Sequence, residues 1–170
     1  MPPPAVDPVH RTSYTFTRQG ETLTVTATFE AGAELPTHSH PRQQEVWWLE
    51  SGTLEFHLDG TWTTITSGTG KITVPRGTVH GLRNTSGREA VGVAEATPAL
   101  DLQEFLVESA AAARKGWIRR GGIPGSLTGA RWAASFLDRF ADQTVMTFPP
   151  PALQKLVRPL GRIGDPPRPF

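Results

Sequence analysis

The chain has 170 residues, of which 37% are hydrophobic, enough for about one domain with a core of its own. Its 17 Lys and Arg residues nearly balance its 16 Asp and Glu residues, so the overall charge gives no indication of nucleic acid as a partner. The sequence contains no cysteine, which excludes disulfides, thiolate metal sites and a cysteine nucleophile and agrees with a reducing compartment.

The first part of the chain, "MPPPAVDPVHRTS", is rich in proline and lacks the apolar segment of a signal peptide. Residues 1–11 show no periodicity, so we expect them to form an extended arm. No stretch reaches the roughly 18 consecutive apolar residues of a membrane span. We therefore expect a cytoplasmic protein.

Residues 12–97 show the pattern of a β domain. Short runs rich in Thr, Val, Phe and Trp are interrupted by Gly or Asn about every eight to twelve residues. "YTFTRQGETLTVTATF" predicts a hairpin with its turn near Gln19-Gly20, and "TLEFHLDGTWTTIT" predicts a second that turns at Asp59-Gly60. Evenly spaced short strands of this kind favour a β-sandwich or barrel over alternating βα units.

The pattern becomes helical in residues 98–170. "LQEFLVESAAAARKGWI" predicts a helix that Gly116 ends, and "SLTGARWAASFLDRFAD" has apolar residues at helical spacing behind a capping Ser126. "PPPALQKLVRPLGRIG" begins as a helix with prolines at its start and then meets Pro159. We expect these helices to form a C-terminal extension that packs on the β domain or at a dimer interface.

Three histidines and a glutamate have the chemistry of a metal site. His38 and His40 lie two residues apart, so in a strand both imidazoles point to the same face. Glu45 opens the apolar run "EVWWLE" and can face back toward them, and His80 follows a Pro-Gly turn in "VPRGTVHGLRN". Three imidazoles and one carboxylate suit a divalent Fe, Mn, Co, Ni or Zn ion and leave two positions of a six-coordinate ion open. The alternative is a pair of surface histidines, because spacing alone does not bring His80 to the others.

Two ordered spacings in the same region resemble the motifs of the cupin superfamily. The first consists of Gly32, His38, His40, Glu45 and Gly52, and the second of Pro75, Gly77, His80 and Asn84. Thr69 stands where the second motif has a glycine. The resemblance implies a mainly β fold over residues 12–97, a conical antiparallel β-barrel (a double-stranded β-helix, jelly-roll-like) with appended C-terminal α-helices. It also implies one divalent transition metal ion inside, bound by His38, His40, Glu45 and His80.

Several apolar residues are candidates for the wall of a substrate pocket. Trp47 shares the face of Glu45, so it either lines a pocket or packs in the core, and Phe56 and Leu82 have the same two interpretations. Trp48 should face outward, where a second subunit or the C-terminal helices would have to cover it. His10 and His57 are expected to be solvated. The arginines near the motifs lie on loops or in the outward register, which favours a hydrophobic or aromatic substrate over a highly anionic one.

Three functions remain open at this point. The first is a metal-dependent enzyme, and its leading form is a dioxygenase that acts on an aromatic or enolic small molecule. This reaction class is preferred because the ligand set resembles that of quercetin and acireductone dioxygenases and germins. Glu45 would then serve as ligand or take the proton of the substrate. The second is a redox-neutral isomerase or a polyketide-type cyclase, and the third is a non-enzymatic ligand- or metal-binding module. For assembly we predict a homodimer with no nucleic-acid partner.

Overall fold

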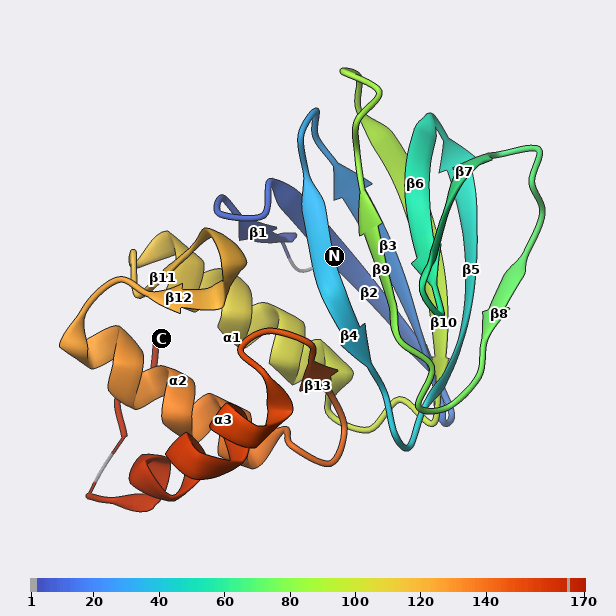
Figure 1. Cartoon of the computed structure of the whole chain (residues 1–170). Coiled ribbons are helices and arrows are strands. Elements are labelled where there is room, and N and C mark those ends of the chain that lie inside the picture. The colour runs from blue at the N-terminus through green and yellow to red at the C-terminus, as the bar shows by residue number, and fades with distance from the viewer. Residues whose placement is uncertain (1–2, 165) are drawn as a thin grey trace.

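The computed structural model describes residues 3–164 and 166–170, and it places two antiparallel sheets beside a group of helices (Figure 1). The first sheet has six strands in the order β1-β2-β3-β10-β5-β8. The bounds of its strands are β1 (Ala5–Asp7), β2 (Thr12–Gln19), β3 (Thr22–Phe29), β10 (Ala90–Thr97), β5 (Gln44–Ser51) and β8 (Ile72–Val74). The second sheet has five strands in the order β13-β4-β9-β6-β7. These are β13 (Val145–Met146), β4 (Glu34–Ser39), β9 (His80–Arg83), β6 (Thr53–Leu58) and β7 (Thr61–Thr66).

The two predicted hairpins form. A two-residue turn at Gly20 and Glu21 connects β2 to β3, and Gly20 has a φ of 57° that glycine adopts without strain. Asp59 and Gly60 connect β6 to β7 with φ values of 46° and 89°, as in a type I′ turn. The twist of this turn type matches that of the flanking strands, which explains why Asp-Gly predicts the hairpin.

The main core lies between the two sheets. β3 alternates half-buried and buried residues along its whole length, as a strand with one face toward a core does. Its inward side chains Leu23 and Val25 belong to one hydrophobic cluster with Phe56 from β6 and Leu82 from β9. The predicted mainly β fold with antiparallel strands and C-terminal helices is therefore confirmed. Hydrogen-bonded pairing keeps the six-stranded and the five-stranded sheet separate, and no pairing among the described strands closes them into one ring.

Within the described residues, three α-helices and two short 3₁₀ helices follow the last long strand. Their bounds are α1 (Leu102–Arg114), η1 (Arg120–Gly122), α2 (Leu127–Arg139), α3 (Pro151–Val157) and η2 (Arg158–Arg162), with a small two-stranded sheet of β11 (Ile118–Arg119) and β12 (Ile123–Pro124) between α1 and α2. Ser126 caps α2 as predicted, because its side chain accepts a hydrogen bond from the backbone N–H of Gly129 at 3.0 Å. Pro159 lies in η2, directly after α3 has ended. Among the described residues, no helix has the length and hydropathy needed to cross a membrane.

The helices are joined to the sheets by shared packing and by a strand. Phe105 of α1 packs against both the core between the sheets and a second hydrophobic cluster that includes Trp132 and Phe136 of α2. β13 comes from the segment after α2, yet it pairs with β4 of the second sheet (Figure 1). Residues on both sides of the predicted boundary near residue 98 therefore contribute to the same sheet.

The predicted N-terminal arm and the outward tryptophan both contact the sheets. β1 lies within the arm and pairs with β2, while residues 1–2 of the arm, and residue 165 of the C-terminal extension, lie outside the described residues. Trp48 is half-buried, and the Lys71 ammonium lies 4.2 Å from the centre of its ring. The outward face of Trp48 thus contacts the side chain of Lys71, which directly precedes β8, and the sequence pattern did not predict this contact.

Candidate metal centre and pocket

Two neighbouring strands bring the three histidines together. His38 on β4 and His80 on β9 are cross-strand partners, and His40 follows directly after β4 ends. The ring centres lie 4.3 Å apart for His38 and His80, 4.8 Å for His38 and His40, and 5.4 Å for His40 and His80. One ligand nitrogen from each ring lies within 4.8 Å of the others, and all three side chains are buried. The chain therefore has a buried three-histidine cluster that could hold a metal ion.

Backbone carbonyls fix the orientation of all three rings. The Nδ1 atom of each histidine lies within hydrogen-bond distance of a backbone oxygen: 2.7 Å from His38 to Pro36, 3.1 Å from His80 to Thr78 and 2.9 Å from His40 to Gln143. A carbonyl can only accept, so in the neutral rings Nδ1 carries the proton and Nε2 has the free lone pair. This is the arrangement in which protein imidazoles bind metal ions through Nε2.

Two Nε2 atoms of the cluster have no hydrogen-bond partner of normal geometry among residues 3–164 and 166–170. Nε2 of His40 and Nε2 of His80 are buried and make no hydrogen bond of normal geometry to any described residue. They face the carboxylate of Glu45, with 3.3 Å between His40 Nε2 and Oε1 and 2.9 Å between His80 Nε2 and Oε2. Buried polar atoms without a partner are costly, and a cation among them would satisfy both nitrogens and the carboxylate. The residues present therefore fit a divalent metal ion.

The pKa values of the cluster follow from burial and from Glu45. Burial and the neighbouring His80 and His40 hold the pKa of His38 well below its usual range, so this ring is neutral. Burial also acts to lower the pKa of His40, but the Glu45 carboxylate outweighs it and raises that pKa. For Glu45, burial alone would raise the pKa, whereas His40 and His80 bring it well below its ordinary value. Glu45 is thus an ionised carboxylate, and a proton on His40 competes with any cation at this position.

Trp47 holds the carboxylate in place. It lies two residues after Glu45 on the same face of β5, and its indole Nε1–H donates a hydrogen bond to Glu45 Oε2 at 2.7 Å. The bond leaves Oε1 free of any indole contact. The i, i+2 spacing in "EVW" is the sequence signal that could have found this contact.

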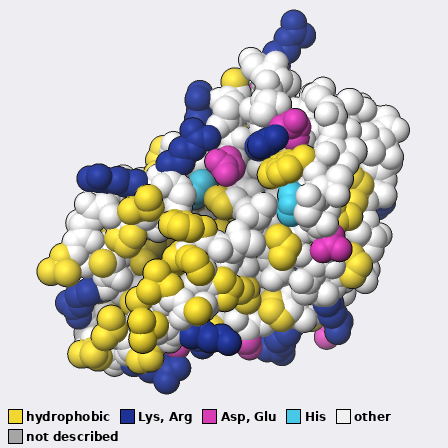
Figure 2. Space-filling model, in the orientation of Figure 1, with side chains coloured by type: hydrophobic (Ala, Val, Ile, Leu, Met, Phe, Trp, Pro, Cys, Tyr) yellow, Lys and Arg dark blue, Asp and Glu magenta, His cyan; other side chains and the backbone are white. Residues whose placement is uncertain are grey.

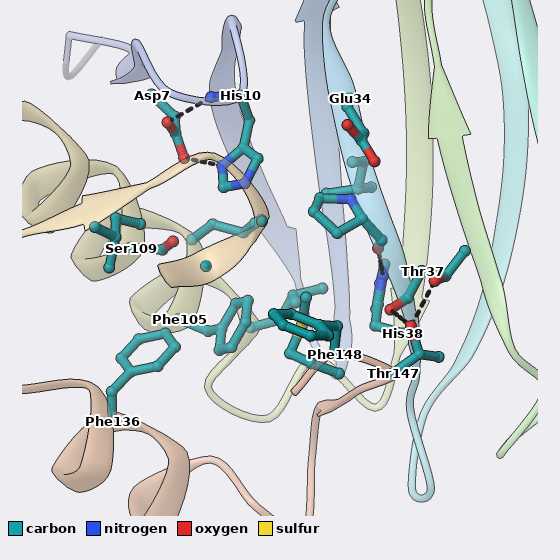
Figure 3. Close-up of a pocket in the computed structure, with 18 of the residues that line it drawn as sticks. Asp7, His10, Glu34, Thr37, His38, Phe105, Ser109, Phe136, Thr147 and Phe148 are labelled. Carbon is teal, nitrogen blue, oxygen red and sulfur yellow. Dashed lines mark hydrogen bonds and ion pairs between the residues drawn. The ribbon is translucent and has the colours of Figure 1, made fainter. Parts of the chain in front are cut away.

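A cavity of about 290 Å³ adjoins the cluster (Figure 3). The sheets contribute His38, His40, Glu45 and Trp47 to its wall, and the helical part contributes Phe105 and Phe136. Aromatic and aliphatic side chains predominate, and no Lys or Arg is among the described residues that line it. Phe56 and Leu82, the other two predicted pocket residues, lie in the core between the sheets and do not line this cavity.

Sequence reasoning missed two groups of residues around the site. Gln143 and Thr144, 103 and 104 positions after His40, approach its Nδ1 atom, and no local pattern predicts a contact over that separation. The second group is Asp7 and His10, which also line the cavity. His10 was expected to be solvated, but its side chain is only 11% exposed because β1 holds the arm against β2. The spacing of a carboxylate three residues before a histidine in "DPVH" was the available signal.

The chain thus combines a mainly β fold of antiparallel sheets with a buried three-histidine cluster and an adjoining apolar cavity. The family model described as Cupin domain matches residues 25–94, which include every residue of the cluster. This part of the chain is therefore similar to a cupin domain.

Solved structures with a similar fold support the mainly β architecture. KdgF from Halomonas sp. is 19% identical with a TM-score of 0.51, over 55% of this chain and 84% of that chain. An RmlC-like cupin from Shewanella frigidimarina is 22% identical with a TM-score of 0.52, over 58% of this chain and 86% of that one. At these identities the likeness concerns the fold. No curated protein matches the chain.

Proposed function

We propose that the protein is a metal-dependent enzyme that acts on a small, mainly apolar molecule of aromatic or enolic character, with a dioxygenase as the leading reaction class. The observation that carries the proposal is a cluster of three carbonyl-oriented histidines, of which His38 and His40 line an apolar cavity without cationic side chains. A non-enzymatic storage site would not need such a cavity beside its ligands.

In this proposal His38, His40, His80 and Glu45 hold one divalent transition metal ion. When bound, the ion supplies a Lewis acid that polarises a substrate oxygen. Glu45 is ionised and has one oxygen free of the indole bond, so it can also accept a proton from the substrate. Trp47 orients that carboxylate and at the same time forms part of the cavity wall.

The helical part supplies the apolar wall that selects the substrate. The ring centres of Phe105 and Phe136 lie 4.8 Å apart, and both rings border the cavity. Aromatic surfaces of this kind bind planar apolar molecules and exclude water from the reacting groups. An anionic substrate would find no lysine or arginine among the described lining residues to balance its charge.

Oxygen uptake tests the reaction class. The protein is loaded with Fe, Ni or Mn and supplied with a panel of flavonols and β-diketones, and we expect metal-dependent oxygen consumption with at least one of them. His38→Ala should abolish it, while His57→Ala, outside the cavity, should not. Substrate turnover at an unchanged rate without oxygen would exclude a dioxygenase and favour the redox-neutral isomerase or cyclase.

We also propose that the chain forms a homodimer. The supporting feature is apolar surface at the C-terminal end, where Leu156, Leu160 and Ile163 are 73%, 60% and 66% exposed. Figure 2 shows hydrophobic side chains gathered over this end of the molecule. Exposed apolar patches of this kind mark association surfaces. Sedimentation of the full chain over a range of concentrations should give the mass of a dimer, and a monomer at all concentrations would contradict it.

A further inference from the structure

A second polar pair lines the cavity, and the function proposed above does not use it. Asp7 ends β1, and His10 follows in the turn that leads to β2. Both residues border the same cavity as His38, which comes from β4 (Figure 3). The pair therefore lies within reach of a molecule in the cavity without belonging to the metal cluster.

The two carboxylate oxygens of Asp7 have different partners. Oδ1 accepts hydrogen bonds from the backbone N–H groups of Val9 at 2.9 Å and His10 at 3.0 Å, which stabilises the turn. Oδ2 lies 2.8 Å from Nδ1 of the His10 ring. Because an ionised carboxylate can only accept, Nδ1 carries the proton, and in the neutral ring Nε2 has a free lone pair.

The free nitrogen of His10 has no hydrogen-bond partner in the part of the chain that the structure describes. Nε2 is buried and makes no hydrogen bond to any described residue. The backbone oxygen of His10 accepts a hydrogen bond from the N–H of Glu34 at 3.0 Å, so the residue is fixed to the start of β4. If the pair served only to stabilise the turn, the bonds of Oδ1 to the backbone would be sufficient. The buried Nε2 atom of His10 would then lower stability, because it has no hydrogen-bond partner. The position of Nε2 is explained if a ligand supplies the missing donor.

We propose that His10 is a substrate-binding residue whose Nε2 accepts a hydrogen bond from a hydroxyl group of the ligand, and that Asp7 is the residue that positions it. The ligand class is then a mainly apolar molecule, aromatic or enolic, that carries a hydroxyl donor for His10. This inference rests on the proposed function in one respect, since it assigns a substrate group to the same cavity. It does not depend on the identity of the metal or on the reaction class.

The test compares two probes that differ in one hydrogen-bond donor, 2-naphthol and its methyl ether 2-methoxynaphthalene. Both are titrated into the full-length protein after chelation, so that a metal ion cannot hold the hydroxyl. We expect wild-type protein to bind 2-naphthol about three- to tenfold more tightly than the ether, the effect of one buried hydrogen bond. His10→Phe should remove this preference, and the matched change His57→Phe should retain it, because His57 packs on Trp62 and does not line the cavity.

Asp7→Asn separates positioning from simple turn formation. An asparagine oxygen can still accept from the two backbone N–H groups, but its amide donates to Nδ1 and moves the ring proton to Nε2. Nε2 is then a donor, so the preference for 2-naphthol should disappear or reverse while the fold persists. An Asp7→Asn protein that folds normally and keeps the wild-type preference would overturn the role of Asp7.

One further measurement tests the inference on the wild-type protein, without any variant. The ¹⁵N resonance of His10 Nε2 in wild-type protein should shift on addition of 2-naphthol and stay in place with the ether. Because the titrations are made after chelation, failure of the metal site does not affect this result. A wild-type protein without preference for 2-naphthol, or an unshifted Nε2 resonance at saturation, would overturn the inference.

Discussion

Replacing Trp47 with Phe tests whether the indole holds the Glu45 carboxylate. The change keeps an aromatic ring at a 4% exposed position and removes the donor 2.7 Å from Oε2. A hydrogen bond to a charged group contributes about 1.5–3 kcal/mol, and the smaller ring adds about 1 kcal/mol for lost packing. We therefore expect the free energy of unfolding to fall by roughly 2–4 kcal/mol. For a chain of this length that corresponds to a melting temperature lower by roughly 5–15 °C.

Trp48→Phe is the matched control, because it makes the same chemical change at the next residue of β5. Trp48 is half-buried and contacts Lys71 through its ring, which phenylalanine preserves, so the loss should stay below about 1 kcal/mol. Thermal unfolding of both variants with a chelator present measures the difference. Equal losses in the two variants would refute the claim that the indole N–H stabilises the buried carboxylate.

Three further predictions concern Glu45, the C-terminal half and an ion pair. Glu45→Gln should weaken metal binding less than loss of a histidine does, yet lower turnover as much or more, and unchanged turnover would limit Glu45 to a structural part. Ending the chain near Leu100 removes β13 and the Gln143 carbonyl that orients His40, so the truncated chain should either aggregate or bind metal at least 10–100-fold more weakly. Sedimentation measures the aggregation, and metal titration measures the affinity. The hydrogen bonds from Arg162 lower the pKa of Asp138, so this pair stabilises the fold above the unfolded pKa of about 4 and ceases to do so as the pH falls through the folded value. Asp138→Asn should therefore lower the melting temperature at pH 7, and its difference from wild type should shrink below about pH 4, whereas a pH-independent difference would contradict the ion pair.

The sequence pattern predicted those features of the structure that depend on residues close together in the chain. The Asp59-Gly60 turn, the Ser126 cap and the shared face of His38 and His40 each depend on residues a few positions apart. The position of His80 beside them did not follow from spacing alone, and the resemblance to two ordered motifs supplied that expectation.

Contacts over long separations could not be predicted in this way. Two such contacts are the pairing of β13 with β4 and the hydrogen bond from His40 to Gln143. Both depend on where the helices place residues 143–146, about 100 positions later in the chain than β4. His10 looked like part of a solvated arm because β1 is only three residues long, and its pairing with β2 buries the pair it forms with Asp7. Short strands of this kind are stabilised by tertiary contacts more than by their own sequence pattern.

Metal analysis of protein purified without chelator or histidine tag tests the central claim most directly. We predict close to one divalent transition metal ion per chain in the wild type. His38→Ala and His80→Ala should each lose most of it, because each removes one ligand of the buried cluster. His57→Ala is the control and should retain full occupancy, since His57 packs on Trp62 away from the cluster. Full occupancy in both His38→Ala and His80→Ala, or a wild-type protein that binds no metal even when it is supplied, would contradict the assignment of the site.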